Sequence, residues 1–311
     1  MNYGELISVI VPVHNRAHLV GRSVGSLIAQ SYRNIEILLV DDCSTDDLPG
    51  AVAALNDPRV RIIRRALNGG AAAARNTGVA EAKGNIIAFH DSDDICVFDR
   101  LEMQARQLAG LGPDYIGSHC SRFFYLQTAE ENYAAGACSL MPSPTQSPLS
   151  GDLFLATVKG NFVSVPTMML RKEAFTASGG FDEGLRNNED WDFALRLTRV
   201  GHFGFIPDPL YLTVYQQPKE RARLHISGND RFSAQSFVKV TGKLRRAGVE
   251  PRRFAHHYAT AARFLLRNGK QKSARRFAMR ALRAKPTSLP IIRAAAFCLI
   301  PAMYRLLNKR R

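Results

Sequence analysis

Several features that would assign this 311-residue chain to a common class are missing from it. The apolar stretch at 294–304 is about half of the ~20 residues that a membrane-spanning helix needs. The five cysteines form no C-x-x-C pair, which predicts reduced thiols in a cytosolic protein rather than a disulfide framework or a zinc site. The N-terminal apolar run is short and has no basic region before it, so it predicts a first strand and not a signal peptide.

The first third of the chain alternates apolar runs of strand length with helical patterns. Residues 6–11, 35–40 and 86–89 have the composition of buried strands. Before the third, a glycine turn at 68–70 opens an alanine-rich helical pattern over 71–78. This alternation predicts an α/β fold with a mostly parallel, Rossmann-like sheet flanked by helices. No G-x-G-x-x-G motif follows the first strand, so the usual dinucleotide fingerprint is absent.

Carboxylates follow two of these predicted strands. Asp41 and Asp42 end the second, and Asp91, Asp93 and Asp94 come just after the third. Open α/β sheets bind their ligands at the carboxyl ends of the strands, and crowded carboxylates repel one another unless a cation lies among them. The pattern therefore predicts a metal–diphosphate site, in which Asp91 and Asp93 converge on a hard divalent ion. For residues 91–94 taken alone, the alternative is a polar turn whose acidic side chains are solvated.

Five segments, in this order, resemble the serial motifs of family 2 glycosyltransferases. They are PVHNR at 12–16, VDDCSTD at 40–46, ARNTG at 74–78, DSDD at 91–94, and GGFDE at 179–183 followed by NEDWDFALRL at 188–197. Each motif is weak singly, but their order and spacing make the signal specific over roughly residues 6 to 215. The resemblance implies the GT-A fold, an inverting mechanism, a nucleotide-sugar donor and a divalent cation, Mn²⁺ or Mg²⁺, at a D-x-D motif.

The resemblance also implies roles at the donor site. His14 would lie against the nucleotide base and Asp42 would accept a hydrogen bond from it. Asp91 would lie near the ribose and the metal, and Asp93 would bind the metal directly. Arg75 would lie near the diphosphate or pair with a strand-end acid, two readings that stay open. The remaining donor-binding positions in these motifs are Pro12, Asn15 and Ser92.

In the last motif, Asp190 matches the general base, and Glu189 and Trp191 would shape the acceptor site. An acceptor hydroxyl is a poor nucleophile until a positioned carboxylate removes its proton. Two alternatives stay open: Asp190 is a first-turn acid favoured by the helix dipole, and Trp191 is a core residue. Many family members carry a histidine after this motif as a further metal ligand. Here His225 is the first candidate, and a loop histidine is the simpler interpretation.

Charge divides the chain near residue 218. Residues 1–218 contain 18 Lys/Arg and 24 Asp/Glu, whereas 219–311 contain 24 and 3, so the net charges of −6 and +21 sum to +15. We therefore predict a catalytic domain at 1–218, with a donor half at about 1–116 and an acceptor half at about 117–218. The basic region at 219–311 predicts an anionic partner, for which a membrane surface is favoured over nucleic acid because interleaved aromatic residues are lacking.

The basic region has a helical pattern. Apolar residues at 258–266 and 274–282, separated by Gly269 and followed by Pro286, are similar to one tetratricopeptide hairpin, or to a generic packed hairpin. Residues 289–307 predict an amphipathic helix with a basic collar that lies in a membrane interface, or else a helix buried against the hairpin.

Together these features predict a metal-dependent inverting glycosyltransferase, peripheral at the inner face of a membrane. It would move a sugar from a nucleotide-diphosphate donor, with UDP favoured by family habit, to a glycan or lipid-linked acceptor in surface polysaccharide or glycolipid biosynthesis. One alternative is a nucleotidyltransferase on a similar sheet, although such enzymes have a glycine-rich basic loop after the first strand. The other is a non-catalytic nucleotide-sugar-binding module.

Overall fold

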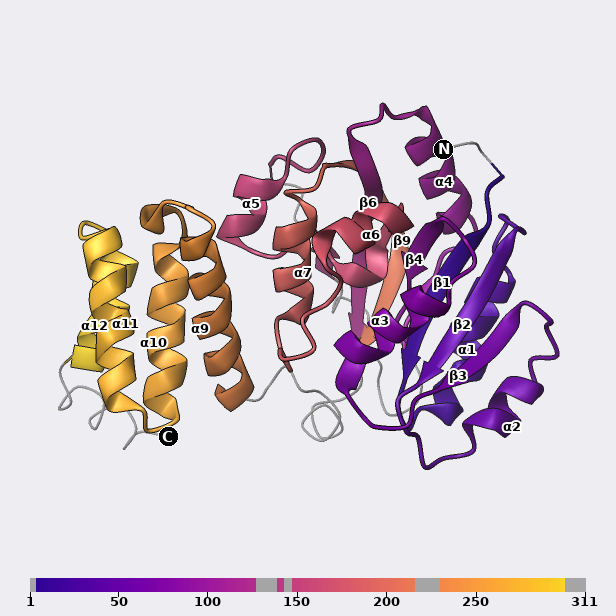
Figure 1. The fold of residues 1–311 in the computed structure, drawn as a ribbon, viewed down its shortest axis with the longest axis horizontal. Helices are drawn as coiled ribbons and strands as arrows, with labels where there is room; N and C mark the ends of the chain where they lie inside the picture. The colour runs from indigo at the N-terminus through magenta and orange to yellow at the C-terminus, as the bar shows by residue number, and fades with distance from the viewer. Residues whose placement is uncertain (1–3, 127–138, 143–146, 216–229, 300–311) are drawn as a thin grey trace. The chain divides into compact units, whose positions relative to one another are not determined.

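The computed structural model describes residues 4–126, 139–142, 147–215 and 230–299 (Figure 1). The chain folds as two compact units. The sheet unit comprises residues 1–183 and 190–224, and the helical unit comprises 184–189 and 225–311. His225, for which a loop histidine was the simpler interpretation than a metal ligand, lies outside the described residues, as does the end of the predicted interfacial helix, residues 300–307.

The sheet unit begins with four parallel strands in the order β3-β2-β1-β4. The strands are β1 (Ile7–Val13), β2 (Ile35–Asp41), β3 (Val60–Arg64) and β4 (Ile86–Phe89). They alternate with α1 (Ala17–Ile28), α2 (Leu48–Ala53) and α3 (Gly70–Glu81). The predicted α/β fold is confirmed, and the carboxyl ends of β1, β2 and β4 lie side by side, as the motif order requires.

Beyond β4 the sheet becomes mixed. Its order continues β4-β8-β6-β9-β5, in which only β6 and β9 pair in parallel, and β7 adds to β6. These strands are β5 (Ile95–Cys96), β6 (Tyr115–Leu126), β7 (Ser139–Met141), β8 (Met168–Arg171) and β9 (His202–Tyr215). The long strand β9 pairs with both β6 and β5, and so returns the chain to the segment that follows β4.

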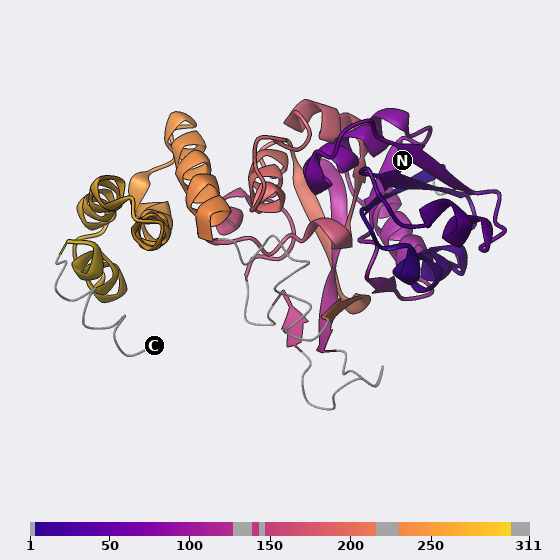
Figure 2. The ribbon, with the colours of Figure 1, turned by 90° about the horizontal axis from the view of Figure 1, so that it is seen from below.

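Helices cover both faces of the sheet, which explains its nearly continuous apolar strands (Figure 2). On one face α1 and α4 (Arg100–Gly110) pack on Ile7, Val9 and Val11 of β1. On the other face α3, α6 (Lys172–Ser178) and α7 (Glu189–Leu197) pack around Ile10 and Phe89. Both faces of β1 are buried. Successive side chains of this strand therefore point alternately into two hydrophobic cores, one on each face of the sheet, and not alternately into a core and into solvent.

Helix α3 approaches the sheet closely at Gly78, and this contact carries a prediction about stability. A Cβ on Gly78 would lie 2.4 Å from Cγ2 of Ile10 and 2.9 Å from Cγ2 of Val40. Gly78→Ala should therefore destabilise the protein by about 1–3 kcal/mol through overpacking. Gly21→Ala on α1, where nothing lies within 4 Å, should instead stabilise by roughly 0.5–1 kcal/mol. Urea denaturation measures both, and equal effects of the two substitutions would contradict this packing.

Buried histidines predict how stability depends on pH. His119 on β6 is fully buried, and burial lowers its pKa to about 4. Between pH 6.5 and about 4 the unfolded chain therefore binds a proton that the folded chain does not, so stability falls as the pH falls through this window. His119→Gln should remove about 2 kcal/mol of the loss between pH 6.5 and 5. Urea denaturation of the wild-type protein and the variant at both pH values decides, and parallel pH profiles for the two proteins would refute the assignment.

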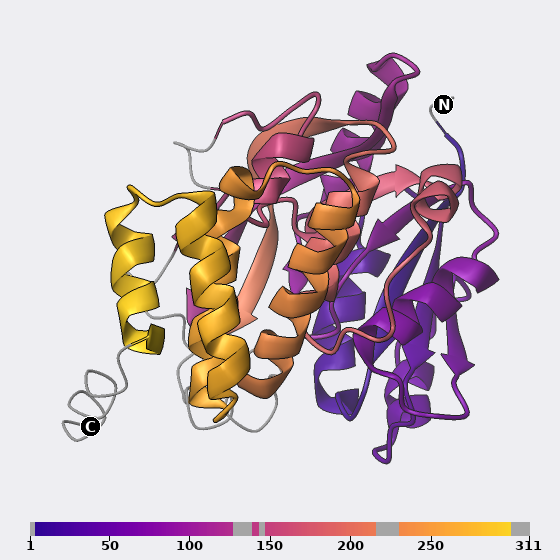
Figure 3. The same cartoon turned by 60° about the vertical axis from the view of Figure 1, so that its left-hand side comes forward.

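The described residues of the helical unit form four α-helices that stand side by side (Figure 3). They are α9 (Asp230–Arg246), α10 (Ala255–Arg267), α11 (Gln271–Ala284) and α12 (Leu289–Leu299). Gly269, with φ +73°, makes the turn between α10 and α11. Helix α12 buries Ile291, Ala294, Ala295 and Cys298, so this face packs against α10 and α11. Within the described residues, no helix is both long enough and apolar enough to span a membrane.

Candidate active site

The residues after β4 present two carboxylates, each paired with an arginine from elsewhere in the chain. The Asp91 side chain is 29% exposed and accepts a 2.8 Å bond from Arg75 Nη2, on α3. The Asp93 side chain is 18% exposed and forms an ion pair with Arg16, at the start of α1. Burial alone would raise the pKa of Asp91, but Arg75, His90 and Arg16 together hold it below the ordinary value. Of the two roles open for Arg75, pairing with a strand-end acid is the one the structure contains.

Buried residues from distant segments support this turn from beneath. The backbone N–H of Asp91 donates to the Tyr211 hydroxyl at 2.9 Å, and Ser23 donates to the Asp91 carbonyl at 3.1 Å. Tyr211 and Arg100 are fully buried, with the guanidinium 5.0 Å from the ring centroid. Arg100 also donates to the carbonyl of Phe89, the last residue of β4, at 3.1 Å. No local sequence signal marks these three residues, because their contacts to the turn are all long-range.

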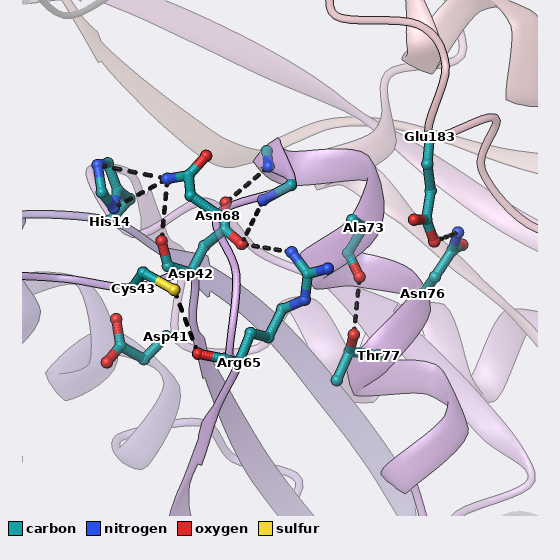
Figure 4. A network of polar contacts seen from close by, with 12 residues as sticks. His14, Asp41, Asp42, Cys43, Arg65, Asn68, Ala73, Asn76, Thr77 and Glu183 are labelled. Carbon is teal, nitrogen blue, oxygen red and sulfur yellow. Dashed lines mark hydrogen bonds and ion pairs between the residues drawn. The ribbon is translucent and has the colours of Figure 1, made fainter.

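Asp42 lies at the N-terminus of α3, as Figure 4 shows. Its carboxylate accepts from the backbone N–H of Gly69 at 3.0 Å and of Gly70 at 2.6 Å, and it pairs with Arg65. The side chain is 5% exposed. A carboxylate offers about four lone-pair positions, so these three contacts leave about one for a ligand. Arg65 was not anticipated from the sequence, where nothing distinguishes it from its neighbour Arg64.

The other acids of the VDDCSTD motif hold the surrounding loops. Asp41 accepts from the N–H of Ser44 at 2.7 Å, and Asp46 accepts from the N–H of Ala17 at 2.7 Å, which caps α1. Cys43, between them, has φ +64°. Asp41 is therefore a turn-stabilising residue, and this motif fixes the start of two helices beside the site.

His14 and Asn15 follow β1 and face the same loops. Asn68 Nδ2 lies 3.3 Å from His14 Nδ1 and also donates to the Asp42 carbonyl at 3.0 Å. Asn15, with φ +54°, accepts from the backbone N–H of Thr45 at 2.7 Å. Non-glycine residues with positive φ are uncommon and collect at functional sites. The exposed His14 ring is thus held at the mouth of the predicted base site.

The ARNTG and GGFDE motifs are joined directly. Asn76 donates to the Phe181 carbonyl at 3.0 Å and accepts from the Phe181 N–H at 2.8 Å. It also lies 2.8 Å from Glu183 (Figure 4). The Arg75 guanidinium lies 5.5 Å from the centroid of the Phe181 ring. These contacts link the donor-side helix α3 to the segment that leads into the predicted base, a connection that the sequence analysis missed.

Asp190 and Asp192 have different environments on α7. Asp192 is buried and pairs with Arg196 at 2.9 Å, one turn along the same helix. Asp190 is half-buried, accepts from Asn161 Nδ2 at 2.9 Å, and has no ion pair with another described residue. A half-buried carboxylate without a cationic partner suits a base better than an ion-paired one. The positive φ of Asn188, +56°, marks the turn before it.

Trp191 belongs to the core. Its side chain is 3% exposed, and its indole N–H donates to the Thr157 carbonyl on α5 (Phe154–Lys159) at 2.8 Å. The ring therefore presents almost no surface to an acceptor. Its position is that of a core residue, which was the second of the two interpretations of Trp191. Glu189, half-buried, is the first residue of α7. Pro12 lies on β1, and Ser92, which lies between Asp91 and Asp93 in the sequence, is buried.

Asp91 and Asp93 have the chemistry of a site for a hard divalent cation. Both offer oxygen donors, both are partly exposed, and they lie two residues apart. Mg²⁺ in particular is often bound through one or two carboxylates plus substrate phosphates, so these two residues fit a nucleotide-bridged ion. Within the described part of the chain, no group of three or more His, Cys, Asp or Glu residues could hold a metal.

Comparison with known proteins gives the family. The model of glycosyl transferase family 2 matches residues 8–175, more than half of the chain. An uncharacterized glycosyltransferase of Rickettsia conorii is 31% identical over 223 residues, which are 71% of this chain and 33% of the relative. The Escherichia coli enzyme WfgD, named as a UDP-Glc:alpha-D-GlcNAc-diphosphoundecaprenol beta-1,3-glucosyltransferase, is 41% identical over 99 residues, 32% of this chain and 39% of WfgD. The matched segment thus spans about a third of these relatives' length.

The fold has solved counterparts. Residues 1–349 of TarS from S. aureus, in complex with UDP-GlcNAc, superpose with a TM-score of 0.54 at 18% identity, covering 94% of this chain and 79% of TarS 1–349. At this identity the similarity establishes the fold alone. With the family model matching across the strand-end acids, this chain belongs to glycosyl transferase family 2.

Proposed function

We propose that this protein is an inverting glycosyltransferase that uses a nucleotide-diphosphate sugar, with a UDP-sugar favoured. The observation that carries the proposal is the set of strand-end acids and arginines around β1, β2 and β4: Asp42 with Arg65, Asp91 with Arg75, and Asp93 with Arg16. Two relatives support the donor class, because WfgD is named for UDP-Glc and TarS was solved with UDP-GlcNAc.

The donor site would bind the two ends of the nucleotide with different residues. His14, Asn15 and Asp42 surround the predicted position of the base, where Asp42 accepts a hydrogen bond with its remaining lone pair. Arg16 and Arg75, already held by carboxylates, are close to the predicted position of the diphosphate. Guanidinium groups match phosphate geometry well, so both can turn toward the diphosphate when it arrives.

Asp190 would act as the general base. Its carboxylate takes the proton of the acceptor hydroxyl while the acceptor oxygen bonds to the anomeric carbon from one face. The bond from that carbon to the diphosphate breaks on the opposite face, and the electron pair leaves with the diphosphate, which inverts the configuration. Asn161 orients the carboxylate through its 2.9 Å bond, and Trp191 fixes α7 through its bond to α5.

The residues that would hold the divalent cation are Asp93 and Asp91. Bound there, Mn²⁺ or Mg²⁺ supplies Lewis-acid stabilisation of the charge that develops on the leaving diphosphate. The chain's own contribution is to hold the two carboxylates at the end of β4 through Tyr211, Ser23 and Arg100.

We place the reaction in the biosynthesis of a polysaccharide or glycolipid, with a lipid-linked glycan as acceptor. WfgD, whose named acceptor is a diphosphoundecaprenol-linked sugar, supports this class. An anionic membrane surface is the second proposed partner, supported by the net charge of +21 in residues 219–311. Glu189 is the proposed acceptor-binding residue at the start of α7.

One assay separates this proposal from a nucleotidyltransferase and from a binding module. The purified protein is incubated with UDP-Glc, UDP-GlcNAc or UDP-Gal, Mn²⁺ and an undecaprenyl-diphosphate-linked GlcNAc, and the product is analysed by NMR. We expect UDP release and a β-linked product from an α-configured donor. In a parallel incubation with UTP and a sugar 1-phosphate, formation of pyrophosphate would identify a nucleotidyltransferase. Donor binding without release of UDP would identify a binding module, and a retained configuration would exclude the inverting mechanism.

A further inference from the structure

A cavity within the helical unit is lined by cations and lies outside every residue assigned above. It has a volume of about 590 Å³ and runs across α10, between α9 and α11. Its charged lining residues are Arg231, Lys239, Arg245, Lys270, Arg276 and Arg280, all exposed. We call this cavity the basic groove. Among the residues that the structure describes, no Asp or Glu lines it.

Acids are few in the segment that forms the basic groove. Asp230 and Glu250 are the sole Asp or Glu residues between positions 230 and 299, a range that is rich in Lys and Arg. Glu250 is already paired with Arg252, at 2.6 Å, and Arg253, at 3.8 Å, neither of which lines the groove. The concentration of positive charge in a concave site raises the local concentration of anions. The groove is therefore built to take a negatively charged ligand.

The floor of the groove is aromatic and its cations stand above it. Tyr258 and Phe277 are 4% and 8% exposed, with their ring centroids 5.8 Å apart. The Arg280 guanidinium lies 5.1 Å from the Phe277 centroid. Burial raises the pKa of Tyr258, and the nearby Arg280 and Arg245, from opposite walls, act against that rise. Two arginines thus approach one floor residue from α9 and from α11.

Cationic side chains recur along the two helices, α9 and α11, that form the walls of the groove. Arg276 and Arg280 are four residues apart on α11, and helical positions at this spacing lie on one face, one turn apart. Lys239 and Arg245 continue the opposite wall on α9. Two rows of cations suit an extended ligand with repeated charges better than a single phosphate. The polar side chains of Gln235, Asn268 and Ser273 also line the groove, where they can bond sugar hydroxyls.

We propose that the basic groove binds a segment of an acidic glycan, so that the acceptor of this enzyme is a polysaccharide chain carrying carboxylate or phosphate groups. That the ligand is a glycan rests on the proposed glycosyltransferase function. The two other polyanions fit less well. Nucleic acid binding without sequence preference relies on exposed aromatic faces for base stacking, and both rings here are buried. A bilayer presents a broad surface, whereas these cations surround a concave floor.

The test measures binding without any donor, so it is independent of transferase activity. Fluorescein-labelled oligogalacturonate is titrated with the full chain and followed by anisotropy, against a neutral maltooligosaccharide of equal length. The groove variant is Arg245→Glu with Arg280→Glu. The matched control is Arg263→Glu with Arg275→Glu, which makes the same change in net charge at exposed positions of α10 and α11 outside the groove. Circular dichroism and thermal unfolding check that both variants fold.

We expect the acidic oligosaccharide to bind and the neutral one not to. The groove variant should weaken binding at least tenfold and the control by no more than twofold, with affinity that falls as salt rises. Equal losses in both variants would show general charge attraction and overturn the groove. Tighter binding of a single-stranded oligonucleotide, or of phosphatidylglycerol vesicles, with the same dependence on Arg245 and Arg280 would reassign the groove to those ligands. Absence of acidic-glycan binding would refute this inference and leave the transferase assay unaffected.

Discussion

Asp190→Asn should lower the turnover of the donor by roughly 10²–10⁴-fold, the contribution of a positioned general base. Asparagine keeps the shape of the side chain and an oxygen that can accept from Asn161, but it cannot take the acceptor's proton. The dissociation constant for the nucleotide sugar should stay within twofold, because no nucleotide contact is assigned to Asp190. Turnover is measured as released nucleoside diphosphate, and donor binding by calorimetry.

The matched control for this experiment is Asp208→Asn, which makes the same change at an exposed acid on β9. It should leave turnover and donor binding unchanged. If Asp190→Asn retained full turnover while the control did too, Asp190 would be a helix-start acid and the base would have to be another residue. If donor binding fell with turnover, the residue would belong to the donor site.

Asp93→Ala should remove the dependence of donor binding on the metal. In the wild-type protein we expect Mn²⁺ to tighten UDP binding at least tenfold, since an ion held by Asp93 would supply positive charge next to the diphosphate. In Asp93→Ala, UDP should bind with the same weak affinity with and without Mn²⁺, because Arg75 and the base site persist. Calorimetric titration of UDP, with and without Mn²⁺, measures this difference. An unchanged metal effect in the variant would exclude Asp93 as a ligand.

The ion pair between Arg16 and Asp93 sharpens this prediction. A cation entering the site must displace the guanidinium, so Arg16→Met should bind Mn²⁺ more tightly than wild type when nucleotide is absent. Arg22→Met is the matched control, because Arg22 contacts the Asp93 carbonyl at 3.3 Å and not its carboxylate. Electron paramagnetic resonance of free Mn²⁺ reports the binding directly. Equal Mn²⁺ affinity in all three proteins would mean that Arg16 does not compete for the site.

The sequence predicted the strands, the acids at their ends and the family, because these depend on local pattern. Apolar runs of four to seven residues with an Asp at or just after their end can be recognised in the sequence. Strands β2 and β4 coincide with two of these runs. The parallel half of the sheet follows from strand–helix alternation. The mixed half does not, since β6, β8 and β9 meet only through pairings between segments distant in sequence.

Most of the groups that contact the site residues could not be predicted from the sequence. Arg65 pairs with Asp42 and Arg16 pairs with Asp93 across long separations in sequence. Because the chain is rich in arginine, no sequence signal distinguishes these two arginines from the others. Asn76 was visible as part of a motif, but its bonds to the Phe181 backbone required the packing of α3 on the following segment. The burial of Trp191 likewise depends on α5, whose Thr157 carbonyl takes its indole proton.

The measurement that tests the central claim most directly is a thermal-shift screen of the wild-type protein against UDP-, dTDP-, GDP-, ADP- and CMP-sugars, each with and without Mn²⁺. A ligand that binds the folded state raises the unfolding temperature by mass action. We predict a rise for one nucleotide class, with the uridine donors first, that requires the metal. No rise with any donor in a well-folded sample, or equal rises for all five classes without metal, would contradict a metal-dependent nucleotide-sugar site at the ends of β1, β2 and β4.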